Sequence, residues 1–382
     1  MSTRRQLISG LGALAASALV GCSGDAAAPT TTNPTTTNPP TTPPAPTTVA
    51  PTTVPATTTA PPATTAAPPA TTAATVPAIP RQPLTGIVLS DPSEAITRPA
   101  LIVKIDNAPG ARANHSGLAN ADIVFEEIVE GSITRFAAVF HSEGSDPVGP
   151  IRSGRSQDVD MLSSFNRPLF AWSGGNAGVT RLIYASTLVS VSHQQQGKAY
   201  YRGPGKMPHN LYSSTDRLWA LALFGHPGPP SLQFEYLGPD ETFVGAPVSE
   251  VDIQMSGIDV TWEWSPDFGV FLRWQEGSPH NDQVNGRIAA TNVVMPVVRY
   301  QPSQVDARSP EAQTIGNGPV YVISDGKQVA GRWSRETNES PFVLASDDGT
   351  PIKLRPGKTW IELVKAVPSF DEANPFADIT FR

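Results

Sequence analysis

The chain has 382 residues and a formal net charge of −7, and cysteine occurs in it once, as Cys22. The acidic balance argues against nucleic acid as a partner, because nucleic-acid binding requires a basic surface. The lone cysteine excludes intramolecular disulfides, and it removes cysteine nucleophiles and thiolate metal sites from consideration.

Residues 1–22 have the layout of a secretory signal, with a basic start, an apolar middle and a small-residue end. Leu19-Val20-Gly21-Cys22 resembles the bacterial lipobox, in which the cysteine is lipidated and becomes the first residue of the mature protein. The alternatives are an ordinary signal peptide or a membrane helix, but the apolar run of about fourteen residues is short for a span. We therefore expect an extracytoplasmic protein anchored to the membrane by a lipidated Cys22.

The start of the signal leaves the export route open. Thr3-Arg4-Arg5 resembles a twin-arginine signal, which implies export of an already folded protein, whereas ordinary Sec export needs no such pair. Cleavage before Cys22 removes both arginines and leaves the mature chain two charges more acidic.

Residues 23–80 are rich in proline, threonine and alanine, and no charged residue occurs between Ala26 and Pro80. Such a segment cannot build a core, and its prolines favour extended polyproline II. At about 3.1 Å per residue, roughly 55 residues reach on the order of 170 Å when fully extended. We expect a disordered tether that holds the remainder of the chain away from the membrane.

Residues 81–228 are predicted to form an α/β domain. Apolar runs followed by turn residues predict strands, and capping or turn residues before amphipathic runs predict helices, with Ser156 as the cap of the first. Strands interleaved with helices indicate a layered domain with a mixed sheet. The expected strands are 101–105, 123–129, 135–140, 168–173 and 188–193, and the expected helices are 157–165, 177–185 and a helix from 213–215 through 221.

Residues 229–382 are predicted to form a mostly β domain. Alternating runs such as VTWEW, FGVFLRW and PVYVIS are separated by Asp-Gly and similar turns, a pattern typical of a small β-sandwich or partly closed barrel. Trp262 lies on the apolar face of its strand and is expected in the core. His280 and Asp282 are expected in a solvated loop between strands, with a secondary polar site as the alternative.

Five motifs carry a resemblance to a known family: VKIDN, ADIVFEEIVEG, PVGPIRS, GGN and PHNLY, which start at positions 103, 121, 147, 174 and 208. Together they resemble the YerB-like bacterial lipoproteins, a family known mainly as a domain of unknown function. The resemblance covers the chain from Pro83 to its C-terminus and implies a two-domain extracytoplasmic lipoprotein without an established activity. Gly154 stands where family members often have alanine, which is expected to loosen that turn.

A polar site is expected in the first domain, because charged residues occur there on otherwise apolar strands and a buried charge needs a partner or a ligand. Arg152 and Arg155 flank a turn that enters a helix, where guanidinium groups and free backbone N–H groups favour phosphate or carboxylate. The alternative is that these arginines only neutralise nearby glutamates. The candidate ligand-binding residues are Asp106, Asn107, Glu126, Arg135, Arg152, Arg155, His209 and Asn210.

Catalysis is a second hypothesis for the same region. If strand alternation continues to position 130, Glu126 and Glu130 share one face about 13 Å apart, whereas Glu127 faces the other way. That separation is too large for a glycosidase pair. A carboxylate pair therefore has to cross strands to Asp106, and His209 is either a general base or a residue that fastens its loop. The histidine spacings predict no metal site, and no cofactor motif occurs.

Three functions thus remain open, and the sequence leaves open whether the protein is an enzyme. The first is a binding module for a polar or anionic envelope ligand, with a cell-wall polymer or an envelope protein as partner. The second is a hydrolase of wall glycan or peptide that uses Asp106, Glu126 or Glu127 with His209. The third is a structural envelope protein whose charges only satisfy one another.

Overall fold

The computed structural model describes residues 80–222, 226, 228–366 and 378–382. The predicted signal, Cys22 and the tether up to position 79 lie outside the described residues, so the expectations for them stay predictions. Among the described residues, no helix is long and apolar enough to cross a membrane.

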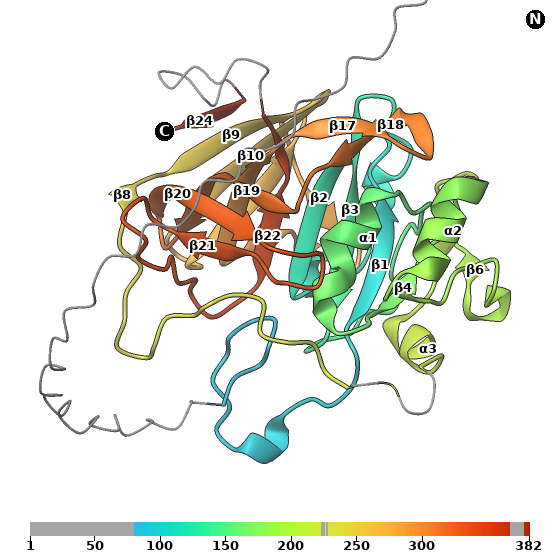
Figure 1. Ribbon diagram of the computed structural model, residues 1–382, viewed down its shortest axis with the longest axis horizontal. Coiled ribbons are helices and arrows are strands. Elements are labelled where there is room, and N and C mark those ends of the chain that lie inside the picture. The colour runs from blue at the N-terminus through green and yellow to red at the C-terminus, as the bar shows by residue number, and fades with distance from the viewer. Residues whose placement is uncertain (1–79, 223–225, 227, 367–377) are drawn as a thin grey trace, which may run out of the picture. The chain divides into compact units, whose positions relative to one another are not determined.

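The largest sheet of the described chain has twelve strands and is mixed (Figure 1). Its main path runs through β21 (Val343–Ala345), β20 (Lys327–Arg335), β19 (Gly316–Ser324), β16 (Asn292–Val298), β22 (Thr359–Glu362), β2 (Ile123–Val129), β3 (Ile133–Phe140), β1 (Leu101–Asp106), β4 (Leu169–Ala171) and β5 (Val189–Ser190), with β8 (Ala246–Pro247) and β23 (Val364–Lys365) at its sides. Strand β1 is antiparallel to β3 and parallel to β4, and β2 is parallel to β22. The mixed sheet expected from the sequence is therefore confirmed.

A second, smaller sheet comes from the C-terminal part of the chain. It consists of β12 (Ser278–Pro279), β11 (Val270–Gln275), β10 (Ile258–Ser265), β9 (Glu250–Met255) and β24 (Ile379–Phe381), and β15 (Ala289–Ala290) pairs with β11. Three hairpins stand apart: β6 (Tyr201–Arg202) with β7 (Leu211–Tyr212), β13 (Asn281–Asp282) with β14 (Gly286–Arg287), and β17 (Tyr300–Ser303) with β18 (Asp306–Ala312).

The helices are short and belong to the first half of the described chain: α1 (Gln157–Leu162), α2 (Ala177–Ala185) and α3 (Thr215–Trp219). A 3₁₀ turn (Ser163–Phe165) prolongs α1 to the predicted end of that helix. The predicted cap of α1 is wrong, because Ser156 makes no capping hydrogen bond and its Oγ lies 2.6 Å from the Oγ of Ser303. Helix α2 is capped by Asn176, whose side chain accepts a hydrogen bond from Val179 N.

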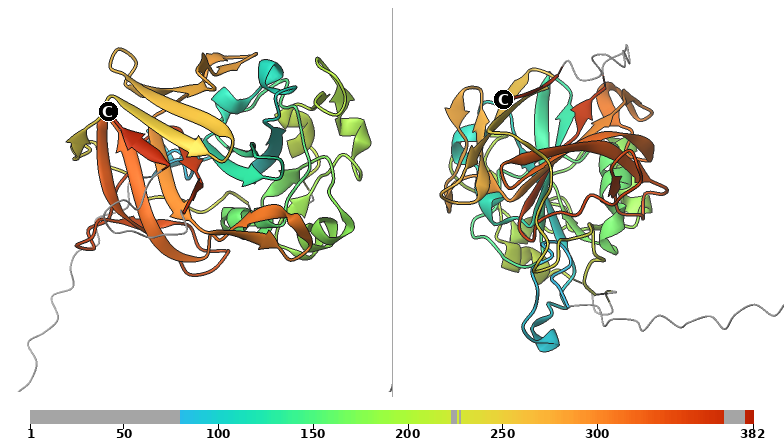
Figure 2. Two further views of the ribbon diagram at one scale, coloured as in Figure 1. Left: turned by 90° about the horizontal axis from the view of Figure 1, so that it is seen from above. Right: turned by 90° about the vertical axis from the view of Figure 1, so that its left-hand side faces the viewer.

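Each face of the large sheet buries its own core, because side chains alternate along a strand. Leu101, Val103 and Ile105 of β1 pack in a core shared with β9, β10 and β11, where Trp262 is fully buried as expected. Ile102 points to the other face, into a core that contains residues of α1 and α2. Figure 2 shows the helices gathered at one end of the molecule and the C-terminal strands at the other.

Strands from both predicted domains share the large sheet. Strand β22, near the C-terminus, pairs in parallel with both β16 and β2, so the sheet continues from one predicted domain into the other. The C-terminal region is mostly β, as expected, and its strands form two facing sheets with a common core. The domain boundary at 228/229 stays a prediction.

Candidate functional site

The candidate site begins at Asp106, the last residue of β1. Alternation places Lys104 and Asp106 on the face of the sheet that the helices cover, and both side chains are fully buried. The backbone turns directly after Asp106, and its Oδ1 accepts a hydrogen bond from Ala108 N at 3.0 Å. The end of the strand and this turn fix the carboxylate in place.

Two partly exposed side chains converge on the other oxygen of Asp106. Arg152 Nε lies 2.9 Å and His209 Nδ1 lies 2.6 Å from Asp106 Oδ2. The Arg152 side chain is 23% exposed and that of His209 is 25% exposed, whereas Asp106 itself is dry. A buried carboxylate thus holds a guanidinium and an imidazole at the surface.

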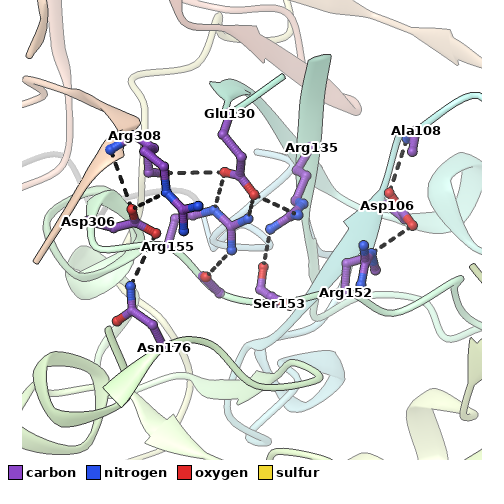
Figure 3. A network of polar contacts seen from close by, with 12 residues as sticks. Asp106, Ala108, Glu130, Arg135, Arg152, Ser153, Arg155, Asn176, Asp306 and Arg308 are labelled. Carbon is purple, nitrogen blue, oxygen red and sulfur yellow. Dashed lines mark hydrogen bonds and ion pairs between the residues drawn. The ribbon is translucent and has the colours of Figure 1, made fainter. Parts of the chain in front are cut away.

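Two further arginines, Arg135 and Arg155, continue this site next to Arg152 (Figure 3). Arg135 Nη1 donates a hydrogen bond to Ser153 O at 2.9 Å, and its Nη2 lies 3.5 Å from Glu130. Arg155 makes a close two-pronged contact with Glu130, in which its Nε donates at 2.8 Å. Figure 3 shows Arg135 between the Arg155–Glu130 pair and the Arg152–Asp106 pair. We call the side chains of Asp106, Glu130, Arg135, Arg152 and Arg155 the arginine cluster.

The arginine cluster contains one more positive than negative charge, since three guanidinium groups face two carboxylates. Arg135 is 3% exposed, and its Nε is buried without a hydrogen-bond partner among the described residues. Burial and the neighbouring Arg152 lower the pKa of Arg135 to about 10, so it stays charged at neutral pH. The terminal nitrogens of Arg152 also have no partner within the described part of the chain. Glu127 and Asp158 beneath the cluster offset part of this charge, so the group left open to a ligand is the partly exposed guanidinium of Arg152.

The start of α1 does not serve as the expected anion site, because the protein already fills it. Asp158 Oδ2 accepts a hydrogen bond from Arg155 N at 2.6 Å. Its Oδ1 accepts one from Lys104 Nζ at 2.6 Å. Of the anion-binding groups predicted here, the Arg152 guanidinium remains partly exposed, whereas the Arg155 guanidinium is bound by Glu130 and the Arg155 backbone N–H by Asp158.

Glu127 is separated from solvent, so it is not a candidate acid/base in the open part of the site. It forms a fully buried ion pair with Lys104, next to Asp158. Burial, opposed by Lys104, raises the pKa of Glu127 to about 7. This second network lies directly beneath the arginine cluster and supports it.

Glu126 lies on the opposite face of the sheet and does not join the arginine cluster. Its Oε2 pairs with Arg273 at 2.5 Å, and its Oε1 accepts a hydrogen bond from Thr134 at 2.6 Å. The prediction that Glu126 and Glu130 share a face is wrong, because Glu130 lies beyond the end of β2, where the chain turns. Strand alternation no longer applies there.

Arg273 is the centre of a buried polar network around Glu126, which we call the sealed network. Glu362, which is opposite Glu126 in the β2–β22 register, lies 3.9 Å from Arg273 Nε and accepts a hydrogen bond from Trp262 Nε1. Burial and the neighbouring Glu126 raise the pKa of Glu362 well above its ordinary value. Arg273 thus lies against two buried carboxylates in the dry space between the sheets.

The sealed network extends to residues that were expected in a loop. His280 Nδ1 lies 2.6 Å from Arg273 Nη1, and His280 Nε2 lies 2.8 Å from His115 Nδ1. His115 Nε2 then contacts the backbone oxygen of Asp106 at 2.6 Å. Both His280 and Asp282 are buried, so the expectation of a solvated loop is wrong.

Two further candidates hold the structure rather than face solvent. Asn107 is fully buried, donates a hydrogen bond to Thr134 Oγ1 and exchanges hydrogen bonds with Gln275, which ties the end of β1 to the second sheet. Asn210 accepts a hydrogen bond from Arg202 at 3.0 Å and donates one to Gly205 O. It therefore fastens the β6–β7 hairpin that carries His209.

Sequence reasoning missed Lys104, His115, Arg273 and Glu362. The signals for Lys104 and Arg273 were present, since a single charge inside LIVKID or VFLRWQ needs a buried partner. Nothing in the sequence indicates which partner, because Glu362 is far from Glu126 along the chain. Among the described residues, no group of three or more histidine, cysteine, aspartate or glutamate side chains is placed to hold a metal ion.

Comparison with known families matches both halves of the described chain. Residues 84–224 match the "Protein of unknown function (DUF3048) N-terminal domain", and residues 251–361 match the corresponding C-terminal domain. The chain belongs to the DUF3048 family. Its motifs around Asp106, Arg152 and His209 fall within the N-terminal match.

A DUF3048 relative is found in Bacillus subtilis under the name "Putative lipoprotein YerB". The two sequences are 27% identical over 309 residues, which covers 77% of this chain and 88% of the relative. The crystal structure of Bacillus subtilis YerB is similar to the present one, with a TM-score of 0.66 and 23% identity, and the match covers 79% of this chain and 99% of that one. The shared fold of this DUF3048 protein is thereby shown.

Proposed function

We propose that this protein is a lipid-anchored component of the bacterial cell envelope that binds an anionic ligand at the arginine cluster. The name of the Bacillus subtilis relative and the lipobox-like sequence at Cys22 support the anchor. The observation that carries the binding proposal is the Arg152 guanidinium, which is 23% exposed and whose terminal nitrogens have no partner among the described residues. A phosphate or carboxylate group would supply the missing acceptors.

Binding is tested with the mature chain carrying Cys22→Ser, which keeps it in solution. Glycerol phosphate and galacturonate serve as small phosphate and carboxylate probes in titration calorimetry. Arg152→Gln is expected to weaken binding about 10- to 100-fold, the worth of a charge-assisted hydrogen bond. Arg308→Gln is the matched control, because Arg308 is 91% exposed and, among the described residues, its side chain pairs only with Asp306. Equal affinity of wild type and Arg152→Gln for both probes would refute the site.

The anchor is tested separately in a host with a lipoprotein-processing pathway. The wild-type chain is expected in the membrane fraction, and Cys22→Ser is expected in the soluble extracytoplasmic fraction. A variant that remains with the membrane would show that another element attaches it.

A hydrolase is the second candidate, favoured by the Asp106–His209 contact alone. A carboxylate at Nδ1 orients an imidazole so that Nε2 is free to accept a proton from water, as in catalytic dyads. Glu126 and Glu127, the two carboxylates expected to pair with Asp106, are both fully buried. Release of soluble products from purified wall by wild type, and not by His209→Gln, would favour this candidate over binding alone.

A further inference from the structure

An uneven distribution of charge surrounds the arginine cluster. No aspartate or glutamate occurs between positions 161 and 215, although the whole chain has a formal charge of −7. The same stretch carries five cations: Arg167, Arg181, Lys198, Arg202 and Lys206. The chain is thus acidic overall, but residues 161–215 form a local basic segment.

These five cations are exposed, and none of them pairs with a carboxylate within the described part of the chain. Arg202 donates a hydrogen bond only to the side-chain amide of Asn210, which leaves its charge unopposed. Lys206 lies in the turn between β6 and β7, where the neighbouring residues are also exposed. Unopposed cations on a surface raise the local potential and concentrate anions near it.

The part of the basic segment in the β6–β7 hairpin adjoins the arginine cluster through His209. His209 belongs to the same hairpin as Arg202 and Lys206, and it shares the Asp106 oxygen with Arg152 at 2.6 and 2.9 Å. A ligand group at Arg152 therefore has the basic hairpin as its immediate neighbour. A single small anion at Arg152 would not contact the basic hairpin.

We propose that the ligand of the arginine cluster is a linear polyanion, a polymer with regularly spaced phosphate or carboxylate groups. One group binds at Arg152, and the following groups lie along the β6–β7 hairpin at Arg202 and Lys206. This inference rests on the binding function proposed above and names its ligand class. A polymer suits the site better than a flat membrane surface, because Arg152 and His209 are about three-quarters buried and a projecting group reaches them more easily than a flat surface does.

The test compares polymer with monomer on the mature chain with the Cys22→Ser background. Poly(glycerol phosphate) and polygalacturonate are titrated against wild type, Arg202→Gln/Lys206→Gln and Arg152→Gln, with glycerol phosphate and galacturonate as monomers. Arg299→Gln/Arg332→Gln is the matched control: both arginines are exposed, Arg332 likewise donates to an asparagine amide, and the pair removes the same charge elsewhere. Vesicles of phosphatidylglycerol form a separate arm, because Met207 beside Lys206 is 72% exposed and would suit a bilayer.

The wild type is expected to bind polymer more tightly than monomer, and the hairpin variant to lose about tenfold of the polymer affinity at low salt. Its monomer affinity and the behaviour of the control pair stay unchanged. Equal affinity for polymer and monomer, with both still dependent on Arg152, would overturn the polymer inference and leave the binding function standing. Loss of Arg152 dependence would overturn both. Hairpin-dependent binding to vesicles without polymer binding would assign the basic segment to the membrane instead.

Discussion

The two faces of β1, β2 and β3 carry similar charged side chains under opposite conditions. On one face Glu126, Glu362 and Arg273 lie dry between two sheets. On the other face Asp106 is dry, but its partners Arg152 and His209 reach solvent. The number of ion pairs does not distinguish these faces. The faces differ in their access to solvent. A ligand can displace water from an exposed side chain, but it cannot displace a packed sheet.

The sealed network around Arg273 is expected to stabilise the fold, and the solvent-reaching contacts of Asp106 with Arg152 and His209 are expected to contribute little to it. Removing one partner of a buried pair leaves an uncompensated charge in a dry site, whereas a partly exposed partner can be replaced by water. The predictions below measure that difference, starting from the largest effect.

Arg273→Met is expected to lower the free energy of unfolding by about 3–5 kcal/mol, because Glu126 and Glu362 are left buried without their cation. Urea denaturation followed by tryptophan fluorescence measures the loss. Arg152→Met is the matched change on the open face. A loss of equal size in the two variants would contradict the expected difference in stability contribution between the two faces.

The buried Glu127 is expected to make stability depend on pH. Its pKa is raised from an ordinary 4.5 to about 7 in the folded protein, so the folded state binds more protons between these values. Its contribution is therefore full below about pH 4.5 and is lost as pH rises to about 7, on the order of 2–3 kcal/mol.

Denaturation curves at several pH values test this contribution of Glu127. The difference in unfolding free energy between wild type and Glu127→Gln should fall as pH increases through that window. A difference that is constant from pH 4.5 to 7 would show that Glu127 is ionised throughout.

Arg152→Gln is expected to cost only about 1–2 kcal/mol of stability, since Asp106 keeps its contacts with His209 and Ala108 N. The same variant loses anion affinity, which separates its binding role from a folding role. Thermal unfolding with and without glycerol phosphate gives both quantities. A cost as large as that of Arg273→Met would mean that the open face also serves stability.

Gly154→Ala is expected to have the smallest effect, about 1 kcal/mol or less. An added Cβ would lie 2.8 Å from Ile183 Cδ1 and 3.1 Å from Trp172 Cε3, and the end of the isoleucine side chain can shift. An alanine is therefore accepted only after a small shift of these neighbouring side chains. Thermal denaturation of wild type and variant measures this, and a much larger loss would show that the packing beneath the arginine cluster is rigid.

Local patterns predicted most of the elements correctly. The apolar run IVFEEIV is β2 from end to end, and the helix expected at 177–185 is α2 with the same bounds. The pairing of Arg155 with a nearby glutamate was also foreseen as an alternative. By contrast, the capping role of Ser156 failed because a tertiary contact with Ser303 replaced the local one.

The sequence by itself determined the acidic balance, the single cysteine, the strand and helix periodicities, and the presence of charges on apolar strands. Only the tertiary structure decided which of those charges meet and which see solvent. Glu126 and Glu127 are neighbours in the chain, yet alternation sends one to Arg273 and the other to Lys104. The partners come from distant segments, and long-range packing of the second sheet and the helices sealed one face of β1–β3 while it left the other partly open.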